Sequence, residues 1–151
     1  MSLEEYRKQR HLEQTSEPKA KREPAHGSLR FVVHEHHASH PHYDLRLELG
    51  GVLKSWAVPK EISTDPKVKR LAIMVEDHPL AYRTFEGTIP QGNYGAGKVK
   101  IWDQGTYTEL HGGSRHEMEA HLKKGLEDGH ISVILKGTHL KGEFTLVRMK
   151  A

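Results

Sequence analysis

Short stretches in which apolar and polar residues alternate make up most of the chain after residue 28. Turn-forming pairs such as Gly50-Gly51 and Asp65-Pro66 separate these stretches. Alternation with a period of two is typical of a β-strand with one buried face. The predicted strands cover residues 29–36, 42–49, 52–58, 70–76, 81–87, 97–102, 105–110, 131–136 and 142–149, with a turn predicted at Asp103-Gln104-Gly105. Their number and spacing predict a mainly β fold, a small antiparallel barrel or sandwich.

One segment near the C-terminus follows a helical pattern instead. Its apolar residues recur every four positions, at Met118, Leu122 and Leu126. Ser114 and Glu117 have the spacing of a capping box, and Gly129 is a typical helix end. We predict one short helix between Ser114 and Asp128.

The first 25 residues differ from the rest in composition. They contain six Lys or Arg and five Glu but few large apolar side chains, and they end at Glu23-Pro24. A segment of this kind cannot form a core of its own. We therefore predict an N-terminal arm over 1–25 that contributes to the functional site, and one domain over 26–151.

Composition excludes several classes of protein. The chain has 151 residues, no cysteine and a formal net charge of +3. Thiolate metal sites, iron–sulfur clusters and cysteine nucleophiles are excluded, and any anionic partner must be bound by a local cluster of basic groups. No membrane span or secretory signal can be drawn in the short apolar runs, so we expect a soluble, cytoplasmic protein.

Histidines are concentrated in one short segment. Of 13 in the chain, five lie within nine residues, at His34, His36, His37, His40 and His42. Strict alternation after His42 places His42, Asp44, Arg46 and Glu48 on one face of a strand. The loop over 37–41 is short enough to bring His36 back beside His42 and Asp44.

Two imidazoles and one carboxylate leave coordination positions open for water and substrate, as hydrolytic metal sites require. Mn²⁺, Zn²⁺ and Fe²⁺ are all compatible with these ligands, and an oxygen-rich substrate favours Mn²⁺. The guanidinium of Arg46 is suited to two phosphate oxygens. The alternative is a solvated, histidine-rich strand face without chemistry.

Other segments carry weaker signals. His78 is expected in the loop after a strand, with Tyr82 exposed nearby, and each is more often structural than catalytic when taken alone. The glycine-rich run 87–97 lacks the ending of a P-loop and is interpreted as a tight β connection. Trp56 and Trp102 lie in apolar patterns and are expected in the core.

Several blocks of sequence, taken together, resemble a known family. They are Phe31 to Glu48, Leu53 to Lys60, Val75-Glu76-Asp77-His78-Pro79-Leu80, Phe85 to Pro90 with Gly95-Ala96-Gly97, and Gly142 to Arg148. In this order they closely resemble the 3′-phosphoesterase domain of bacterial ligase D and its free-standing bacterial and archaeal relatives. The chain looks like a stand-alone version.

This resemblance implies a manganese-dependent enzyme that trims the 3′ ends of DNA or of primers with terminal ribonucleotides. In the family, a diesterase step removes a ribonucleoside and leaves a 3′-phosphate, and a monoesterase step then exposes the 3′-hydroxyl. The implied fold is a small β barrel with its site in a concave face. The implied partners are a primer-template and the ligase or polymerase of an end-joining system.

The resemblance also implies roles for individual residues. His36, His42 and Asp44 match the metal ligands, Arg46, Lys60, His78 and Tyr82 match phosphate-contacting or catalytic positions, and Arg70 matches a position that supports activity. In the arm, Arg10 and Glu17 fit positions implicated in the diesterase step. His11 stands where an Asp is usual and His34 where a Gln is usual, so either imidazole is an alternative contact for metal or phosphate.

The mechanism we expect is metal-assisted attack of water on a terminal phosphate. Arg46 and Lys60 would neutralise charge, His78 would protonate the departing oxygen and Tyr82 would orient the phosphate. A second metal and a covalent histidine intermediate stay open as alternatives.

Two other classes of function also stay open. The first is a non-catalytic module that binds nucleic-acid ends, in which His34 or His40 completes a structural metal site. The second is a metal-dependent small-molecule hydrolase with a closed apolar pocket.

Overall fold

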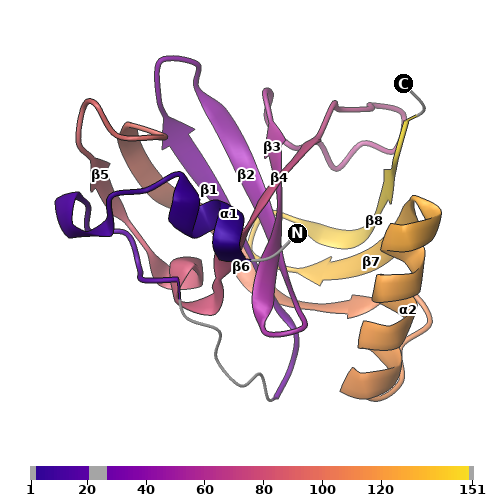
Figure 1. The fold of residues 1–151 in the computed structure, drawn as a ribbon. Coiled ribbons are helices and arrows are strands. Elements are labelled where there is room, and N and C mark those ends of the chain that lie inside the picture. Colours follow the sequence, from indigo (N-terminus) through magenta and orange to yellow (C-terminus); the bar gives the residue numbers. More distant parts are fainter. Residues whose placement is uncertain (1–2, 21–26, 150–151) are drawn as a thin grey trace.

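The computed structural model, which describes residues 3–20 and 27–149, contains one eight-stranded antiparallel sheet. The strand order is β4-β3-β2-β1-β6-β7-β8, and β5 pairs with β6 off this path. The sheet curls into a half-barrel (Figure 1). The mainly β prediction is confirmed.

The strands are β1 (Arg30–His37), β2 (His42–Leu49), β3 (Val52–Val58), β4 (Ile73–Pro79), β5 (Gly87–Ile89), β6 (Gly97–Glu109), β7 (His130–Lys136) and β8 (Lys141–Val147). The α-helices are α1 (Leu3–Lys8) and α2 (Arg115–Asp128). Two short 3₁₀ helices, η1 (Leu12–Gln14) and η2 (Leu80–Thr84), complete the described elements. No helix in these described ranges is long and apolar enough to cross a membrane.

Helix α2 begins and ends where its sequence signals predict. The Ser114 side chain accepts a hydrogen bond from the Glu117 backbone, the Glu117 side chain accepts one in return, and Gly129 adopts the left-handed conformation that ends the helix. Met118 and Leu122 are buried. The predicted helix is therefore confirmed.

The hairpin of β1 and β2 gives the sheet two different faces. Phe31 pairs with Leu47 and Val33 with Leu45, and these apolar side chains belong to the larger core. That core continues into α2, β7 and β8, and α2 lies beside β7 in Figure 1. The larger core comprises Leu29, Phe31, Val33, Leu45, Leu47, Leu49, Trp56, Tyr107, Met118, Leu122, Ile131, Val133, Leu135 and Leu140.

The other face of the hairpin carries polar groups and a smaller core. Here His36 pairs with His42, and His34 pairs with Asp44. The smaller core joins the arm and η2 to the sheet, and consists of Tyr6, Leu53, Tyr82, Phe85, Ile89 and Val99. The arm packs here through Tyr6, which is fully buried. Although the arm has no core of its own, it completes one.

Two strand predictions need correction. The strand predicted over 81–87 is replaced by η2. Tyr82 and Phe85 both belong to the smaller core, and their spacing of three matches one turn of a 3₁₀ helix rather than the period of two of a strand. The strand predicted over 70–76 runs over Ile73–Pro79 instead. The expected connection over 87–97 is confirmed as β5 paired with the start of β6.

The predicted turn at Asp103-Gln104-Gly105 is also wrong, since β6 is one continuous strand of 13 residues. Asp103 instead accepts hydrogen bonds from the backbone of Thr138, His139 and Leu140 in the β7–β8 turn. A Cβ on Gly105 would lie 2.0 Å from the Lys136 carbonyl oxygen, so this glycine permits the close approach of β7.

Candidate active site

The three sequence-predicted metal ligands come together at the turn end of the β1–β2 hairpin. His36 Nδ1 lies 3.6 Å from Asp44 Oδ2, and His42 Nε2 lies 3.2 Å from Asp44 Oδ1. One potential ligand atom from each residue lies within 4.8 Å of the other two. Asp44 is only 4% exposed, whereas His42 is half-buried. The cluster therefore has a fixed carboxylate and at least one side open to solvent.

Backbone carbonyls fix the orientation of both imidazoles. His36 Nε2 donates to the Gly95 carbonyl at 2.8 Å, and His42 Nδ1 donates to the His40 carbonyl at 3.0 Å. Because a carbonyl only accepts, each outward nitrogen carries a proton, and in the neutral ring the inward nitrogen keeps the lone pair that a metal ion could accept. Metal-binding histidines have this arrangement. The donor set of two nitrogens and a carboxylate fits a divalent transition metal.

Asp44 stays ionised despite its burial. Burial raises the pKa of its carboxyl, but Arg46 and the two imidazoles outweigh burial and hold that pKa well below its ordinary value. The hydrogen bond that the protonated ring of His42 donates to Asp44 raises the pKa of His42. The carboxylate is therefore available as a ligand at any pH at which His42 is neutral.

Arg46 connects this cluster to a second group of buried side chains. One terminal nitrogen lies 3.3 Å from Asp44 Oδ2 and the other lies 3.2 Å from His78 Nδ1. Its Nε donates to His34 Nδ1 at 3.2 Å, and its guanidinium lies 4.9 Å from the ring centroid of Tyr82. Arg46 is 4% exposed, so these contacts fix its orientation.

His34 does not line an open site. It is fully buried, and its Nε2 donates to the Phe85 carbonyl at 3.0 Å while its Nδ1 accepts from Arg46. Burial and Arg46 lower its pKa to about 3. With both nitrogens occupied, the expectation that His34 contacts metal or phosphate is not supported. Its contacts are those of a residue that positions Arg46.

His78 and Tyr82 are not exposed in a loop as expected. His78 is the sixth residue of β4 and 2% exposed, and Tyr82 lies in η2 and is also 2% exposed. His78 Nδ1 lies 3.0 Å from the Glu76 carbonyl, and its Nε2 lies 3.3 Å from Arg10. Burial, Arg46 and Arg10 all lower its pKa well below the ordinary value. A neutral, enclosed imidazole is a poor proton donor.

The arm reaches the same network through Arg10 and Glu17. Arg10 bonds to Glu17 and to Glu76, each at 3.0 Å, and its side chain is 5% exposed. Tyr82 donates to Glu17 at 2.6 Å, and burial is the main reason that the pKa of Tyr82 is raised. Sequence reasoning missed Glu76, although its place two residues before His78 puts both on one face of β4.

Three other candidates lie away from this network. Lys60 is exposed two residues after Val58, which pairs with Tyr43 at the metal-cluster end of β2. Arg70 is exposed, donates to the Glu61 carbonyl at 2.9 Å, and lines a different cavity beside Trp102. His11 is exposed at the start of η1. Their roles stay predictions.

Comparisons with known proteins agree with this geometry. A family model described as the DNA ligase D 3′-phosphoesterase domain matches residues 34–148. The chain belongs to the DNA ligase D 3′-phosphoesterase domain family, and the resemblance seen in the sequence is confirmed.

Curated relatives are similar along nearly the whole chain. It is 51% identical over 148 residues to the multifunctional non-homologous end joining protein LigD of Pseudomonas aeruginosa, covering 97% of this chain and 16% of that protein. It is 47% identical to the multifunctional non-homologous end joining DNA repair protein LigD of Mycobacterium tuberculosis, covering 97% and 18%. For LigD of Mycolicibacterium smegmatis the identity is 42%, covering 98% and 19%. The chain spans less than a fifth of the length of each of these relatives.

Proposed function

We propose that this chain is a metal-dependent phosphoesterase that processes the 3′ ends of DNA or of primers, removing a terminal ribonucleoside and a 3′-phosphate to leave a 3′-hydroxyl. The observation that carries the proposal is the buried carboxylate of Asp44, which faces one nitrogen of each of two imidazoles and the guanidinium of Arg46. A phosphate ester needs these two kinds of positive charge, a metal and a guanidinium, close together. Membership of the 3′-phosphoesterase family supports the reaction class.

His36, His42 and Asp44 would hold the metal, for which we propose Mn²⁺. When bound there, the ion would supply Lewis-acid polarisation of a phosphoryl oxygen and an activated water. The chain's own contribution is orientation, because carbonyl acceptors at Gly95 and His40 fix both imidazoles before the ion binds.

Arg46 would bind the phosphate beside the metal. Its contacts to Asp44, His34 and His78 hold the guanidinium in one position, so it loses little freedom when substrate binds. Lys60, exposed at the same end of the sheet, would add a second positive charge from solvent.

The role of general acid that the sequence suggested for His78 stays a prediction, and its surroundings favour a different one. Enclosed between Arg10 and Arg46, the ring fits a positioning role, in which its one unprotonated nitrogen accepts a hydrogen bond from one of the two guanidiniums. Tyr82 donates a hydrogen bond to Glu17 and contacts the ring of His78, so it helps to hold that ring in place. Neither side chain has the exposure that contact with a departing nucleoside requires.

Two of the candidate residues of the arm are enclosed in the same way as His78 and Tyr82. Arg10 and Glu17 were expected to hold the ribonucleoside that the diesterase step removes. Their side chains are 5% and 1% exposed and bond to residues of the domain, so we propose that they stabilise the site for both steps. Removing the arm should then lower both activities rather than ribonucleoside removal alone.

The alternative of a non-catalytic end-binding module needs a fully ligated metal. Among the described residues, neither His34 nor His40 joins the group formed by His36, His42 and Asp44. Open coordination positions favour the enzyme. Because the relatives are named for non-homologous end joining, we propose DNA end repair as the setting, with the ligase and polymerase of such a system as partners.

The test uses purified protein, Mn²⁺ and two labelled primer-templates, one ending in a ribonucleotide and one ending in a 3′-phosphate. We expect the first to lose its ribonucleoside and the second to release inorganic phosphate. Retention of both ends, with the primers still bound, would instead favour the end-binding module.

A further inference from the structure

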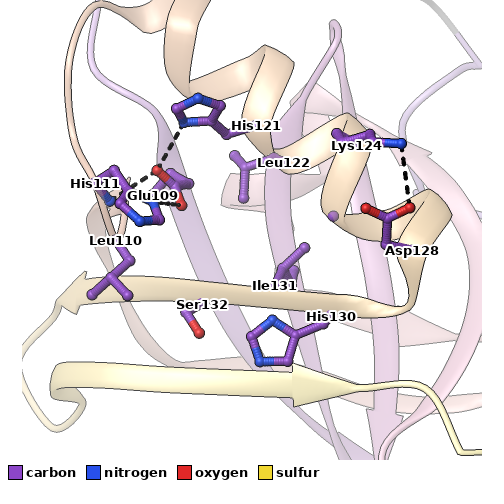
Figure 2. Close-up of a pocket in the computed structure, with 11 residues that line it drawn as sticks. Glu109, Leu110, His111, His121, Leu122, Lys124, Asp128, His130, Ile131 and Ser132 are labelled. Carbon is purple, nitrogen blue, oxygen red and sulfur yellow. Dashed lines mark hydrogen bonds and ion pairs between the residues drawn. The ribbon is translucent and has the colours of Figure 1, made fainter.

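A second group of histidine and carboxylate side chains lies on the opposite face of the sheet, at the junction of β6 and α2. Figure 2 shows Glu109, His111 and His121 converging at one end of a cavity of about 470 Å³. Glu109 is the last residue of β6, His111 lies in the following turn, and His121 lies on α2. Nothing in the proposed phosphoesterase reaction uses them.

The potential ligand atoms are already close together. His111 Nδ1 lies 3.0 Å from Glu109 Oε2, and His121 Nδ1 lies 3.3 Å from Glu109 Oε1. Ligand atoms from the three residues lie within 4.8 Å of one another. Atoms bound to a single Zn²⁺ at about 2.2 Å can be at most about 4.4 Å apart. A small rotation of the two imidazoles therefore suffices to place all three around one ion.

The group combines a fixed carboxylate with accessible imidazoles. The Glu109 side chain is 9% exposed and also accepts a hydrogen bond from the His111 backbone at 2.9 Å. The side chains of His111 and His121 are 74% and 55% exposed. Burial of Leu122 beside His121 fixes the helix that carries this imidazole. An ion can thus reach the group from solvent without any change in the fold.

We propose that Glu109, His111 and His121 bind one Zn²⁺ through a carboxylate oxygen and the Nδ1 atoms of both imidazoles, with water in the remaining position. No phosphate substrate adds oxygen ligands here, so the ordinary affinity order for nitrogen and oxygen donors applies, in which Zn²⁺ binds more tightly than Mn²⁺. The ion would tie the end of β6 to α2 across the turn between them. Because all three ligands are in place only in the folded chain, Zn²⁺ raises the melting temperature.

The competing interpretation is that the two histidines only form hydrogen bonds with Glu109. The double substitution His111→Asn and His121→Asn separates the two interpretations, because an Asn amide can donate to Glu109 in place of Nδ1–H but is a poor Zn²⁺ ligand. His116→Asn is the matched control, as it replaces another exposed histidine of α2.

The experiment measures Zn²⁺ binding to the full chain by titration calorimetry, and melting temperature with and without Zn²⁺. All proteins carry Asp44→Asn, so that the site on the other face does not contribute. We expect one bound Zn²⁺ and a higher melting temperature for this background and for the His116→Asn control, and loss of both effects in the double variant. Nitrogen NMR of the histidine rings should identify Nδ1 as the ligand atom.

Equal Zn²⁺ binding by the double variant and the control would overturn the proposal, as would a background protein that binds no Zn²⁺. If the double variant does not fold, Glu109→Gln with circular dichroism as the folding check gives the same test. Phosphoesterase activity is not a readout here, so failure of this proposal is distinguishable from failure of the proposed function.

Discussion

The two histidine–carboxylate groups have the same kinds of donor atom and very different surroundings. In the first group, Asp44 is linked through Arg46 to a buried network of charged and aromatic side chains. In the second, Glu109 bonds to two exposed imidazoles, and no arginine lines the adjoining cavity among the described residues. Donor atoms alone therefore define a metal site, whereas the arginine beside them suggests phosphoester chemistry.

The two groups also differ in the free-energy cost of burying their charged side chains. Burying several charged groups requires near-complete pairing, because each unpaired buried charge costs several kcal/mol. The network around Arg46 meets this requirement with Arg10, Glu17 and Glu76. At the second group only Glu109 is buried, and its carboxylate is paired with two exposed imidazoles and one backbone N–H. The first site should therefore be sensitive to substitution in both activity and stability, and the second in Zn²⁺ binding and in the stability that Zn²⁺ adds.

The largest expected difference is in catalysis. Asp44→Asn should lower phosphate release by about 10³-fold, because it removes a charged ligand from the metal and a partner from Arg46. Glu109→Gln should leave the rate unchanged. Rates of phosphate release from a 3′-phosphate primer, with circular dichroism as the folding control, test both. A similar loss for both variants would contradict the distinction between the two sites.

Arg46→Lys should lower the rate by about 10²-fold, although the charge is kept. One ammonium cannot keep the contacts to Asp44, His34 and His78 and also bind two phosphate oxygens. Steady-state kinetics on the same primer test this. A near-wild-type rate would mean that Arg46 acts only as a positive charge.

Arg10→Ala should destabilise the fold by about 3 kcal/mol, since it leaves Glu17 and Glu76 buried without their guanidinium partner. Arg7→Ala, which removes only an exposed contact to a backbone carbonyl, should have little effect. Urea unfolding measures both variants. We also expect Arg10→Ala to lower both steps together. Loss of ribonucleoside removal alone, at unchanged stability, would return Arg10 to the leaving-group role that the sequence suggested.

The smallest expected effect is a change in acid sensitivity. The pKa of His34 is lowered to about 3 in the folded chain, so below its ordinary value only the unfolded chain binds this proton. Because of this group, the free energy of unfolding should fall by about 1.4 kcal/mol for each unit by which the pH is lowered in this range. The amide of the His34→Gln variant can keep both hydrogen bonds. Between about pH 6.5 and about pH 5, the free energy of unfolding of this variant should fall by about 2 kcal/mol less than that of the wild type. Parallel stability curves for the two proteins would contradict this.

The sequence predicted that His36, His42 and Asp44 lie together, because strict alternation reports which residues share a strand face. The same reasoning placed His36 opposite His42, as the register confirms. It could not predict that His78 and Tyr82 are enclosed, because both rings are covered by Tyr6 of the arm, which is distant in sequence. The expected turn at Asp103 was wrong for a similar reason, since its carboxylate bonds to a loop 35 residues or more away.

The most direct test of the account is metal dependence at the first site. Protein is stripped with EDTA and assayed for phosphate release from a 3′-phosphate primer while Mn²⁺ is added back, with bound metal measured in parallel. The account predicts no release in chelator and recovery as Mn²⁺ binds to wild type, with no recovery in Asp44→Asn. Full turnover by protein shown to contain no metal would contradict it.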